Sequence, residues 1–120
     1  MSSKLPNFIE TRPFSESWDD LNLRDEDLQS LQQAILRDPT KAPVIPGTGG
    51  LRKLRFVPRR WSKGKRGALR VCFVYFQEDG VVLLALCYSK TEKDDLSPDD
   101  KKAIRQLIQR QEQAFRGSPG

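Results

Sequence analysis

Residues 68–90, "ALRVCFVYFQEDGVVLLALCYSK", contain two apolar segments separated by a turn signal. Both segments, 68–76 and 81–90, are rich in valine, leucine and aromatic residues, a composition that favours strands. The Asp79-Gly80 pair between them is typical of a β-hairpin turn. Because "VVLLALCY" is an uninterrupted apolar run, we expect the second strand to lie centrally in a sheet and to be covered on at least one face.

The segment before this hairpin predicts a further strand. Residues 51–57, "LRKLRFV", alternate between apolar and basic side chains. Since successive residues of a strand face opposite sides of the sheet, Leu54 and Phe56 are expected on one face. Lys53 and Arg55 are then expected on the other. Short connections between the three strands indicate an antiparallel meander.

Two further segments complete the sheet and its entry. "NFIETRPF" (7–14) predicts a short first strand that Pro13 ends. "PTKAPVIPGTGG" (39–50) predicts a loop. Its "GTGG" resembles a phosphate-binding loop only superficially, because a Lys-Ser/Thr pair and a helix do not follow. We therefore expect these glycines to permit a tight turn into the next strand.

Three segments predict helices around the sheet. Phe14 and Trp18 have the i, i+4 spacing of a short helix. "DEDLQSLQQAILRD" (25–38) has an apolar face and an acidic first turn, and Pro39 ends it. "LSPDDKKAIRQLIQRQEQAF" (96–115) begins with Ser97 as N-cap and carries a narrow apolar stripe.

These elements predict an α+β fold. It consists of a small antiparallel β-sheet, made of the short N-terminal strand plus the three-stranded meander, with N-terminal helices and a C-terminal helix. A chain of 120 residues is expected to form a single domain. Residues 1–7 and 116–120 are expected to be flexible tails.

Charge is strongly segregated along the chain. Residues 39–77 hold ten of the 21 basic residues and none of the 16 acidic ones, so the rest of the chain has an acidic excess. Such a distribution creates a local field that favours a polyanion. Nucleic acid is the first candidate, an anionic membrane surface the second and an acidic protein the third.

Composition excludes several kinds of site. The chain has no histidine, which excludes histidine-based triads and zinc sites with histidine ligands. Cys72 and Cys87 lie in apolar runs without metal-ligand spacing, so we expect reduced core thiols. No metal or cofactor is expected. The sequence also shows no secretory signal and no apolar run near the roughly 18 residues of a membrane span, so we expect a cytoplasmic protein and no membrane.

A cationic cluster is the main candidate site. Lys53 and Arg55 on one strand, Arg70 on the next and Lys90 at the end of the third can share one sheet face. Like charges across neighbouring strands are destabilising, so such a cluster points to polyanion binding. In RNA, cationic groups can also promote attack of a 2′-OH on the adjacent phosphorus, because they stabilise the charge that develops on the phosphoryl oxygens.

Other basic and aromatic residues extend this cluster. The connection between the first two meander strands is a basic loop, and nearby aromatic side chains offer stacking surfaces for bases. The expected contacts to RNA or the ribosome are Arg52, Arg59, Arg60, Trp61, Lys63, Lys65, Arg66, Tyr88 and Lys93. Surface anchoring is the alternative for Trp61, and core packing the alternative for Tyr75.

The segments "GTGGLRKLR", "GKRGALRV" and "LLALCYSKTEKDDLS", followed by a terminal helix, resemble the RelE/HigB-type toxins of bacterial type II toxin–antitoxin modules. The resemblance covers roughly residues 8–115. It implies a RelE-like fold and a ribosome-dependent endoribonuclease that cuts mRNA in the A site and leaves a 2′,3′-cyclic phosphate. It also implies a cognate antitoxin, commonly with a helix-turn-helix domain, and we expect an acidic contact surface on it.

The resemblance assigns roles to four positions. A basic pair on the first meander strand matches Lys53 and Arg55, the arginine that opens the next strand matches Arg70, and the basic residue after the last strand matches Lys90. Where the best-studied branch has a tyrosine before the terminal helix, this chain has Leu96. The general base is therefore left open, with Tyr88 or a lysine as candidates.

Two other functions fit the same resemblance. Toxins of the ParE branch share the fold but bind DNA gyrase and cleave nothing, and fold alone does not determine function. A non-catalytic module that binds RNA or the ribosome is the other alternative. The basic residues at 53, 55, 70 and 90 favour RNA cleavage.

Overall fold

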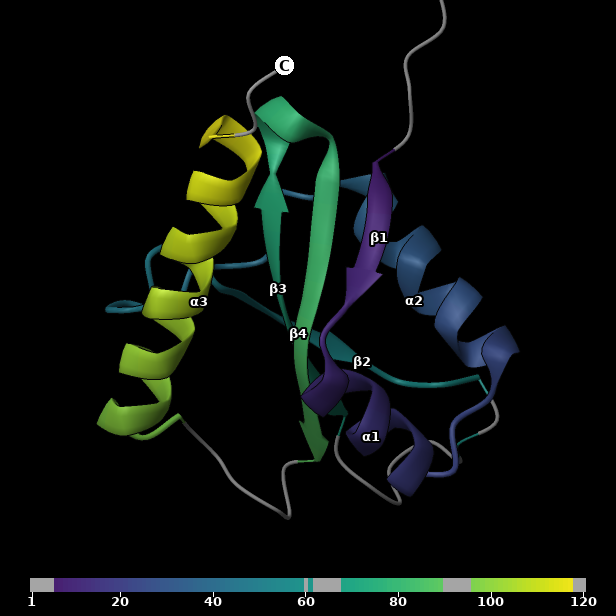
Figure 1. Cartoon of the computed structure of the whole chain (residues 1–120). Coiled ribbons are helices and arrows are strands. Elements are labelled where there is room, and N and C mark those ends of the chain that lie inside the picture. Colours follow the sequence, from purple (N-terminus) through teal and green to yellow (C-terminus); the bar gives the residue numbers. More distant parts are fainter. Residues whose placement is uncertain (1–5, 60, 62–67, 90–95, 118–120) are drawn as a thin grey trace, which may run out of the picture.

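The structure is a computed structural model, and it describes residues 6–59, 61, 68–89 and 96–117. Along the chain, the elements are β1 (Asn7–Glu10), α1 (Arg12–Asp20), α2 (Asp25–Arg37), β2 (Arg52–Phe56), β3 (Leu69–Phe76), a 3-10 turn (Gln77–Asp79), β4 (Val81–Ser89) and α3 (Pro98–Gly117). Figure 1 shows the sheet with α3 along one side and with α1 and α2 on the other.

The sheet is built around the predicted hairpin. Its strands have the order β1-β4-β3-β2. β2, β3 and β4 are antiparallel neighbours, which confirms the meander and the central place of β4. The 3-10 turn between β3 and β4 ends at Gly80, whose φ of 65° is in the left-handed region that favours glycine. The α+β fold class is therefore confirmed.

β1 differs from the prediction of an antiparallel sheet. It pairs with β4 in parallel, and Asn7 lies opposite Val81. A parallel pair needs a long crossover between its strands, and here the chain from α1 to the 3-10 turn provides it. The prediction that Pro13 ends this strand is wrong, because β1 already ends at Glu10. Pro13 lies instead in the first turn of α1, where its missing N–H has no helical partner to lose.

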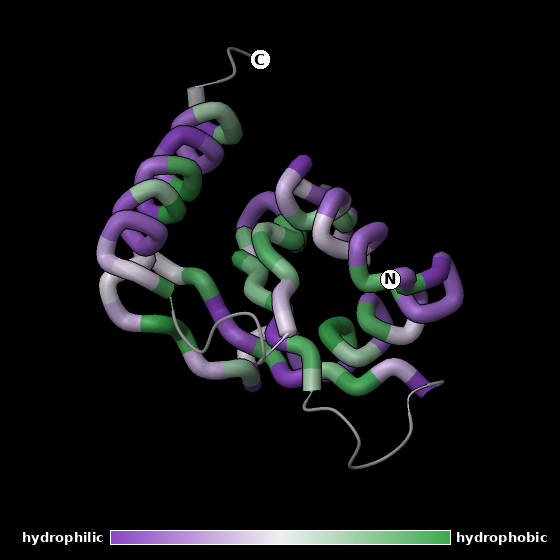
Figure 2. Tube along the Cα trace, turned by 90° about the horizontal axis from the view of Figure 1, so that it is seen from below, coloured by the Kyte–Doolittle hydropathy of each residue, from purple (hydrophilic) through white to green (hydrophobic). Residues whose placement is uncertain are grey.

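Two hydrophobic cores cover the two faces of the sheet. The first contains Phe14, Trp18, Leu31, Ile35, Leu69, Val71 and Phe73, and lies against α1 and α2. The second contains Cys72, Val74, Phe76, Ile104 and Ile108, and lies against α3. The apolar stripe predicted for α3 therefore packs on the sheet. In Figure 2, α3 leads to the C label and carries both hydrophilic and hydrophobic residues, as a helix with one buried face should.

Both cysteines are buried and free of disulfide bonds, as predicted. Cys72 belongs to the core under α3, whereas Cys87 belongs to the core under α1 and α2. The thiols therefore point to opposite faces of the sheet. Each acts as a small apolar side chain in the packing.

The predicted ends of the long helices are confirmed. α2 ends at Arg37, directly before Asp38. At the start of α3, the Ser97 hydroxyl accepts from the Asp100 N–H at 3.0 Å, and the Asp100 carboxylate accepts from the Ser97 N–H at 3.1 Å. The predicted tails are shorter than expected, since Asn7 belongs to β1 and α3 continues to Gly117.

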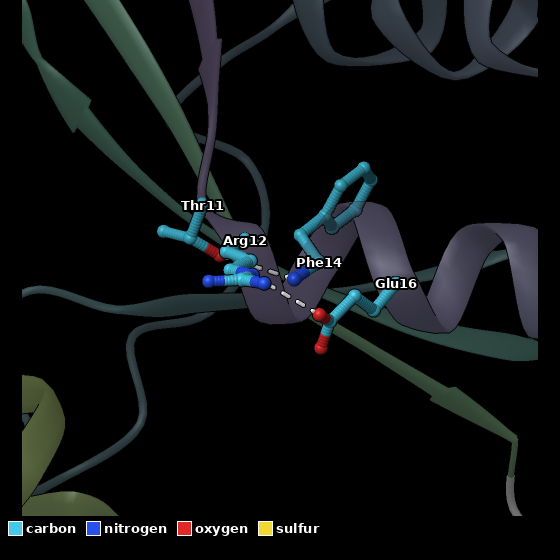
Figure 3. A network of polar contacts seen from close by, with 4 residues as sticks. All are labelled: Thr11, Arg12, Phe14 and Glu16. Carbon is cyan, nitrogen blue, oxygen red and sulfur yellow. Dashed lines mark hydrogen bonds and ion pairs between the residues drawn. The ribbon is translucent and has the colours of Figure 1, made fainter.

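Thr11 joins the start of α1 to an irregularity in β4. Its hydroxyl accepts from the Phe14 N–H at 3.1 Å, which caps the helix (Figure 3). The same hydroxyl donates to the Ala85 carbonyl at 2.8 Å. Cys72 pairs with Leu86 and Phe73 with Leu84, so Ala85 is the extra residue of a β-bulge. Thr11 therefore stabilises a point where the ladder is interrupted.

We expect Thr11→Ala to lower the free energy of unfolding by about 1–2 kcal/mol, because it removes a helix cap and a hydrogen bond to the bulge together. Urea unfolding followed by circular dichroism measures this loss. Thr11→Ser keeps both hydrogen bonds and should restore most of the stability. Thr40→Ala is the matched control, since the Thr40 hydroxyl donates to the neighbouring Asp38 carboxylate on the surface. Equal losses in Thr11→Ala and Thr40→Ala would contradict the assignment.

Candidate functional site

The predicted basic residues of β2 and β3 share one face of the sheet. Arg55 lies opposite Arg70, and Lys53 lies opposite Cys72. Directly paired residues of antiparallel strands project to the same side, and Cys72 belongs to the core under α3. Lys53, Arg55 and Arg70 therefore lie on the α3 side of the sheet. The alternation in the sequence predicts only that Lys53 and Arg55 lie on the face opposite Leu54 and Phe56.

Backbone hydrogen bonds show how closely Arg55 and Arg70 approach each other. The Lys53 N–H points away from β3 and donates to the Pro43 carbonyl at 3.0 Å. Lys53 is thus in a non-hydrogen-bonded position of the ladder, and Arg55, two residues on, is in the next one. Such pairs have the shortest distance between their Cα atoms, about 4.5 Å. The Cα atoms of Arg55 and Arg70 are therefore at the closest spacing that an antiparallel pair allows.

Arg70 is the most constrained member of this group. It is half-buried, and its guanidinium donates to the Ala68 carbonyl at 3.0 Å. On one side of Arg70 lies Arg55 of β2, which is exposed. No ion pair between either arginine and an acidic residue is recorded within the described part of the chain. The pair thus presents uncompensated positive charge, which suits a phosphate group.

Tyr88 lies on the other side of Arg70, directly across from it on β4. The β-bulge at Ala85 shifts the alternation of β4, so Tyr88 belongs to the core under α3. Only 6% of Tyr88 is exposed. This burial disfavours the predicted stacking of Tyr88 on a base, and gives its ring a packing role beside the arginines.

A hollow of about 700 Å³ lies beside β2 and reaches this cluster. Its lining comes from the end of α2, the loop after it, β2 and β3, and consists of Ala34, Ile35, Arg37, Asp38, Lys41, Ala42, Pro43, Lys53, Leu54, Arg55, Arg70 and Phe73. Most of its exposed lining is apolar, and its charged groups are basic with the exception of Asp38. Arg37 and Lys41 were not predicted as site residues, although Lys41 belongs to the acid-free segment 39–77.

The "GTGG" segment forms the predicted tight entry into β2. Gly47, Gly49 and Gly50 all have positive φ angles. The buried Thr48 hydroxyl donates to the Ile45 carbonyl at 2.6 Å and accepts from the Leu51 N–H at 3.1 Å. These bonds close the loop on itself, so it has a structural role that needs no phosphate.

The other predicted binding residues have different environments. The Arg52 guanidinium donates to the carbonyls of Thr40 and Ala42, at 2.9 and 2.6 Å, and so ties the loop to β2.

Trp61 packs against the core under α1 and α2, which favours the anchoring alternative, and Tyr75 packs against the same core. Arg59 is exposed. Their contacts with RNA stay predictions.

Six predicted residues lie outside the described residues: Arg60, Lys63, Lys65, Arg66, Lys90 and Lys93. Lys90 is the fourth predicted catalytic residue. It follows Ser89, the last residue of β4, and Ser89 pairs with Leu69 next to Arg70. β4 therefore ends at the same end of the sheet as the arginine pair.

Among the described residues, no group of three or more potential ligands is placed to hold a metal ion. The chemistry available to the described cluster is electrostatic. Three cationic side chains can hold a phosphodiester and stabilise charge that develops on its oxygens.

No family model matches the chain. Among solved structures, the chain is similar to the E. coli toxin RelE, determined as a double arginine-to-alanine mutant in the free state. The two share 14% sequence identity with a TM-score of 0.53, and the match covers 76% of this chain and 90% of that chain. The chain therefore has a RelE-like fold, as the sequence resemblance predicts. None of the helices that the structure describes combines the length and apolar character needed to cross a bilayer.

We expect Arg55→Gln to raise the free energy of unfolding by about 0.2–1 kcal/mol, because it removes a like charge opposite Arg70. The gain should shrink in high salt, which screens exposed charges. Urea unfolding at low and high salt measures both effects. Arg12→Gln is the matched control, since Arg12 is exposed and pairs with Glu16. A loss of stability in Arg55→Gln at low salt would show that Arg55 is not under repulsion.

Proposed function

We propose that the chain is the toxin of a type II toxin–antitoxin system and a ribosome-dependent mRNA endoribonuclease that inhibits translation. The observation that carries this proposal is the Arg55–Arg70 pair, which Lys53 joins on the same face. Two like charges on directly paired residues lower the stability of the sheet. A phosphate bound to both guanidinium groups would offset this repulsion, so the pair fits phosphate binding. The RelE-like fold supports the same conclusion, because the similar solved structure is that of a toxin.

The proposed reaction is cleavage of a phosphodiester by its own ribose. The 2′-oxygen attacks the adjacent phosphorus, the bond from phosphorus to the 5′-oxygen breaks, and a 2′,3′-cyclic phosphate remains. Arg70, oriented by its bond to the Ala68 carbonyl, is placed to stabilise the charge on the phosphoryl oxygens. Arg55 holds the phosphate from the neighbouring strand. Lys53 and Lys90 are the proposed proton-transfer groups.

The ribosome would supply the substrate in this scheme. A cluster of three cations on an open face provides affinity for any phosphate backbone, so restriction to mRNA requires a second surface that aligns the codon. The basic segment 59–66 is proposed for contacts with the ribosome. Neutralisation would come from a cognate antitoxin that covers the cluster, and the site of action would be the cytoplasm.

We expect Arg70→Ala to reduce mRNA cleavage by about 10²- to 10³-fold, the usual loss when one charge-stabilising donor is removed. Primer extension on mRNA from cells that express the wild type should show cuts in phase with codons, and these cuts should fade in the variant. Arg12→Ala is the matched control, because it removes an arginine charge from an exposed ion pair on α1. The Arg12→Ala protein should cleave mRNA as the wild type does.

Two results would contradict the RNase proposal. Intact mRNA together with double-strand DNA breaks in wild-type cells would indicate gyrase as the target. Ribosome binding without cleavage, with a salt dependence that weakens in Arg70→Ala, would indicate a non-catalytic module. Circular dichroism of purified Arg70→Ala checks that a loss of cleavage is not a loss of folding.

A further inference from the structure

A second hollow, of about 380 Å³, lies between α3 and the start of α1 (Figure 1). Ala85 and Leu86, at the bulge of β4, also line it. Most of its exposed lining is apolar, and none of its residues lines the hollow beside β2. It is therefore a separate surface from the arginine cluster.

Four residues of α3 recur at the 3-4-3 spacing of a heptad seam: Asp100, Ala103, Leu107 and Arg110. All four line this second hollow. Ala103 and Arg110 are exposed, whereas Asp100 and Leu107 are half-buried. The stripe that packs α3 on the sheet contains Ile104 and Ile108 instead. The four residues therefore form a further seam on this helix, the α3 seam.

The α3 seam begins with an acid and ends with a base. None of the residues three or four positions from Arg110 is acidic, so no carboxylate in the same helix neutralises it. No ion pair of Arg110 is recorded among the described residues. At the other end, the Asp100 carboxylate accepts from the Ser97 N–H at 3.1 Å and has the capacity to accept further hydrogen bonds. The seam thus offers an acceptor at one end and a guanidinium donor at the other.

We propose that the chain forms a homodimer in which the two α3 helices pack antiparallel through this seam. In the sequence, the midpoint between Asp100 and Arg110 is also the midpoint between Ala103 and Leu107. In an antiparallel pair, Asp100 therefore lies opposite Arg110 of the partner subunit. Ala103 lies opposite Leu107 of the partner subunit. A two-fold axis repeats both contacts, as an isologous interface requires.

The shape of the hollow suits the apolar contact. Because Ala103 is small, the hollow beside it has room for a leucine side chain, which would also contact Pro13 and Leu86. A side chain of one helix that enters a hole beside the other helix is the packing of a coiled coil. Dimerisation would bury the part of Leu107 that the monomer leaves exposed, which contributes to association.

Charge complementarity favours a second copy of the chain as the occupant. A seam with an acid at one end and a base at the other is complementary to itself when it is reversed. A parallel copy would place like charges opposite each other at both ends, which is repulsive. The seam therefore selects the antiparallel orientation. The inference goes beyond the proposed function and does not depend on it.

Sedimentation velocity of the full chain over about 1 μM to 1 mM tests the inference. The wild type should change from monomer to dimer within this range, because the interface is small. Ala103→Glu should raise the dissociation constant about tenfold or more, since it places a charge against the partner subunit's Leu107. Gln109→Glu is the matched control, because it adds the same charge at an exposed position of α3 outside the hollow. It should dimerise as the wild type does.

A charge-swapped pair of variants tests the antiparallel register. Asp100→Lys and Arg110→Glu each create two like-charged pairs in their own homodimer, which should raise the dissociation constant by about tenfold. In an equimolar mixture, the introduced lysine faces the introduced glutamate. The unchanged Arg110 of one variant then faces the unchanged Asp100 of the other. The mixture should therefore dimerise with a dissociation constant within about threefold of the wild type.

Circular dichroism checks that each variant is folded. Asp100→Lys keeps the backbone N–H that the Ser97 hydroxyl caps. If this variant nevertheless fails to fold, Ala103→Glu and Arg110→Glu decide the question without it, because both residues are exposed.

Three results would overturn the inference. A wild type that stays monomeric at about 1 mM leaves the seam to a different protein. A dimer that Ala103→Glu leaves intact uses another surface. Weak homodimers of both charge variants without recovery in the mixture exclude the antiparallel arrangement. These experiments contain no RNA, so their outcome is independent of the cleavage assay.

Discussion

Burial of the β3–β4 hairpin on both faces is the constraint on which the rest of the structure depends. Successive side chains of β3 enter different cores, Val71 on the side of α1 and α2 and Cys72 on the side of α3. A sheet with two apolar faces needs cover on both. The N-terminal helices supply one cover and the C-terminal helix the other.

The charged site lies at β2, where only one face of the sheet carries apolar residues into a core. β2 is an edge strand, and only one of its sides carries apolar residues into a core. Its other side is therefore available for Lys53 and Arg55, which would be too costly to bury without partners. Arg70, one strand further in, is half-buried and fixed by the Ala68 carbonyl. The site therefore combines a fixed, half-buried Arg70 with an exposed Arg55 at the open edge.

Much of this arrangement follows from local patterns. The i, i+4 aromatic pair, the acidic first turn of α2, the capping Ser97 and the alternation in β2 all act over a few residues, so the sequence displays them directly. The parallel pairing of β1 does not follow in this way, because a four-residue strand carries too little pattern to select its neighbour. The hollow beside β2 was also not predicted, because its lining comes from four separate segments.

The sequence by itself determined the strands and helices, the side of β2 that bears Lys53 and Arg55, and the segregation of charge, since each depends on the spacing of neighbouring residues. Only the tertiary structure decided the parallel pairing of β1 with β4 and the register that places Arg55 opposite Arg70. The bulge at Ala85, which Thr11 stabilises from the other end of the chain, places Tyr88 on the same side as Arg70. The physical reason is that a register is a property of two segments, and neither segment specifies it alone.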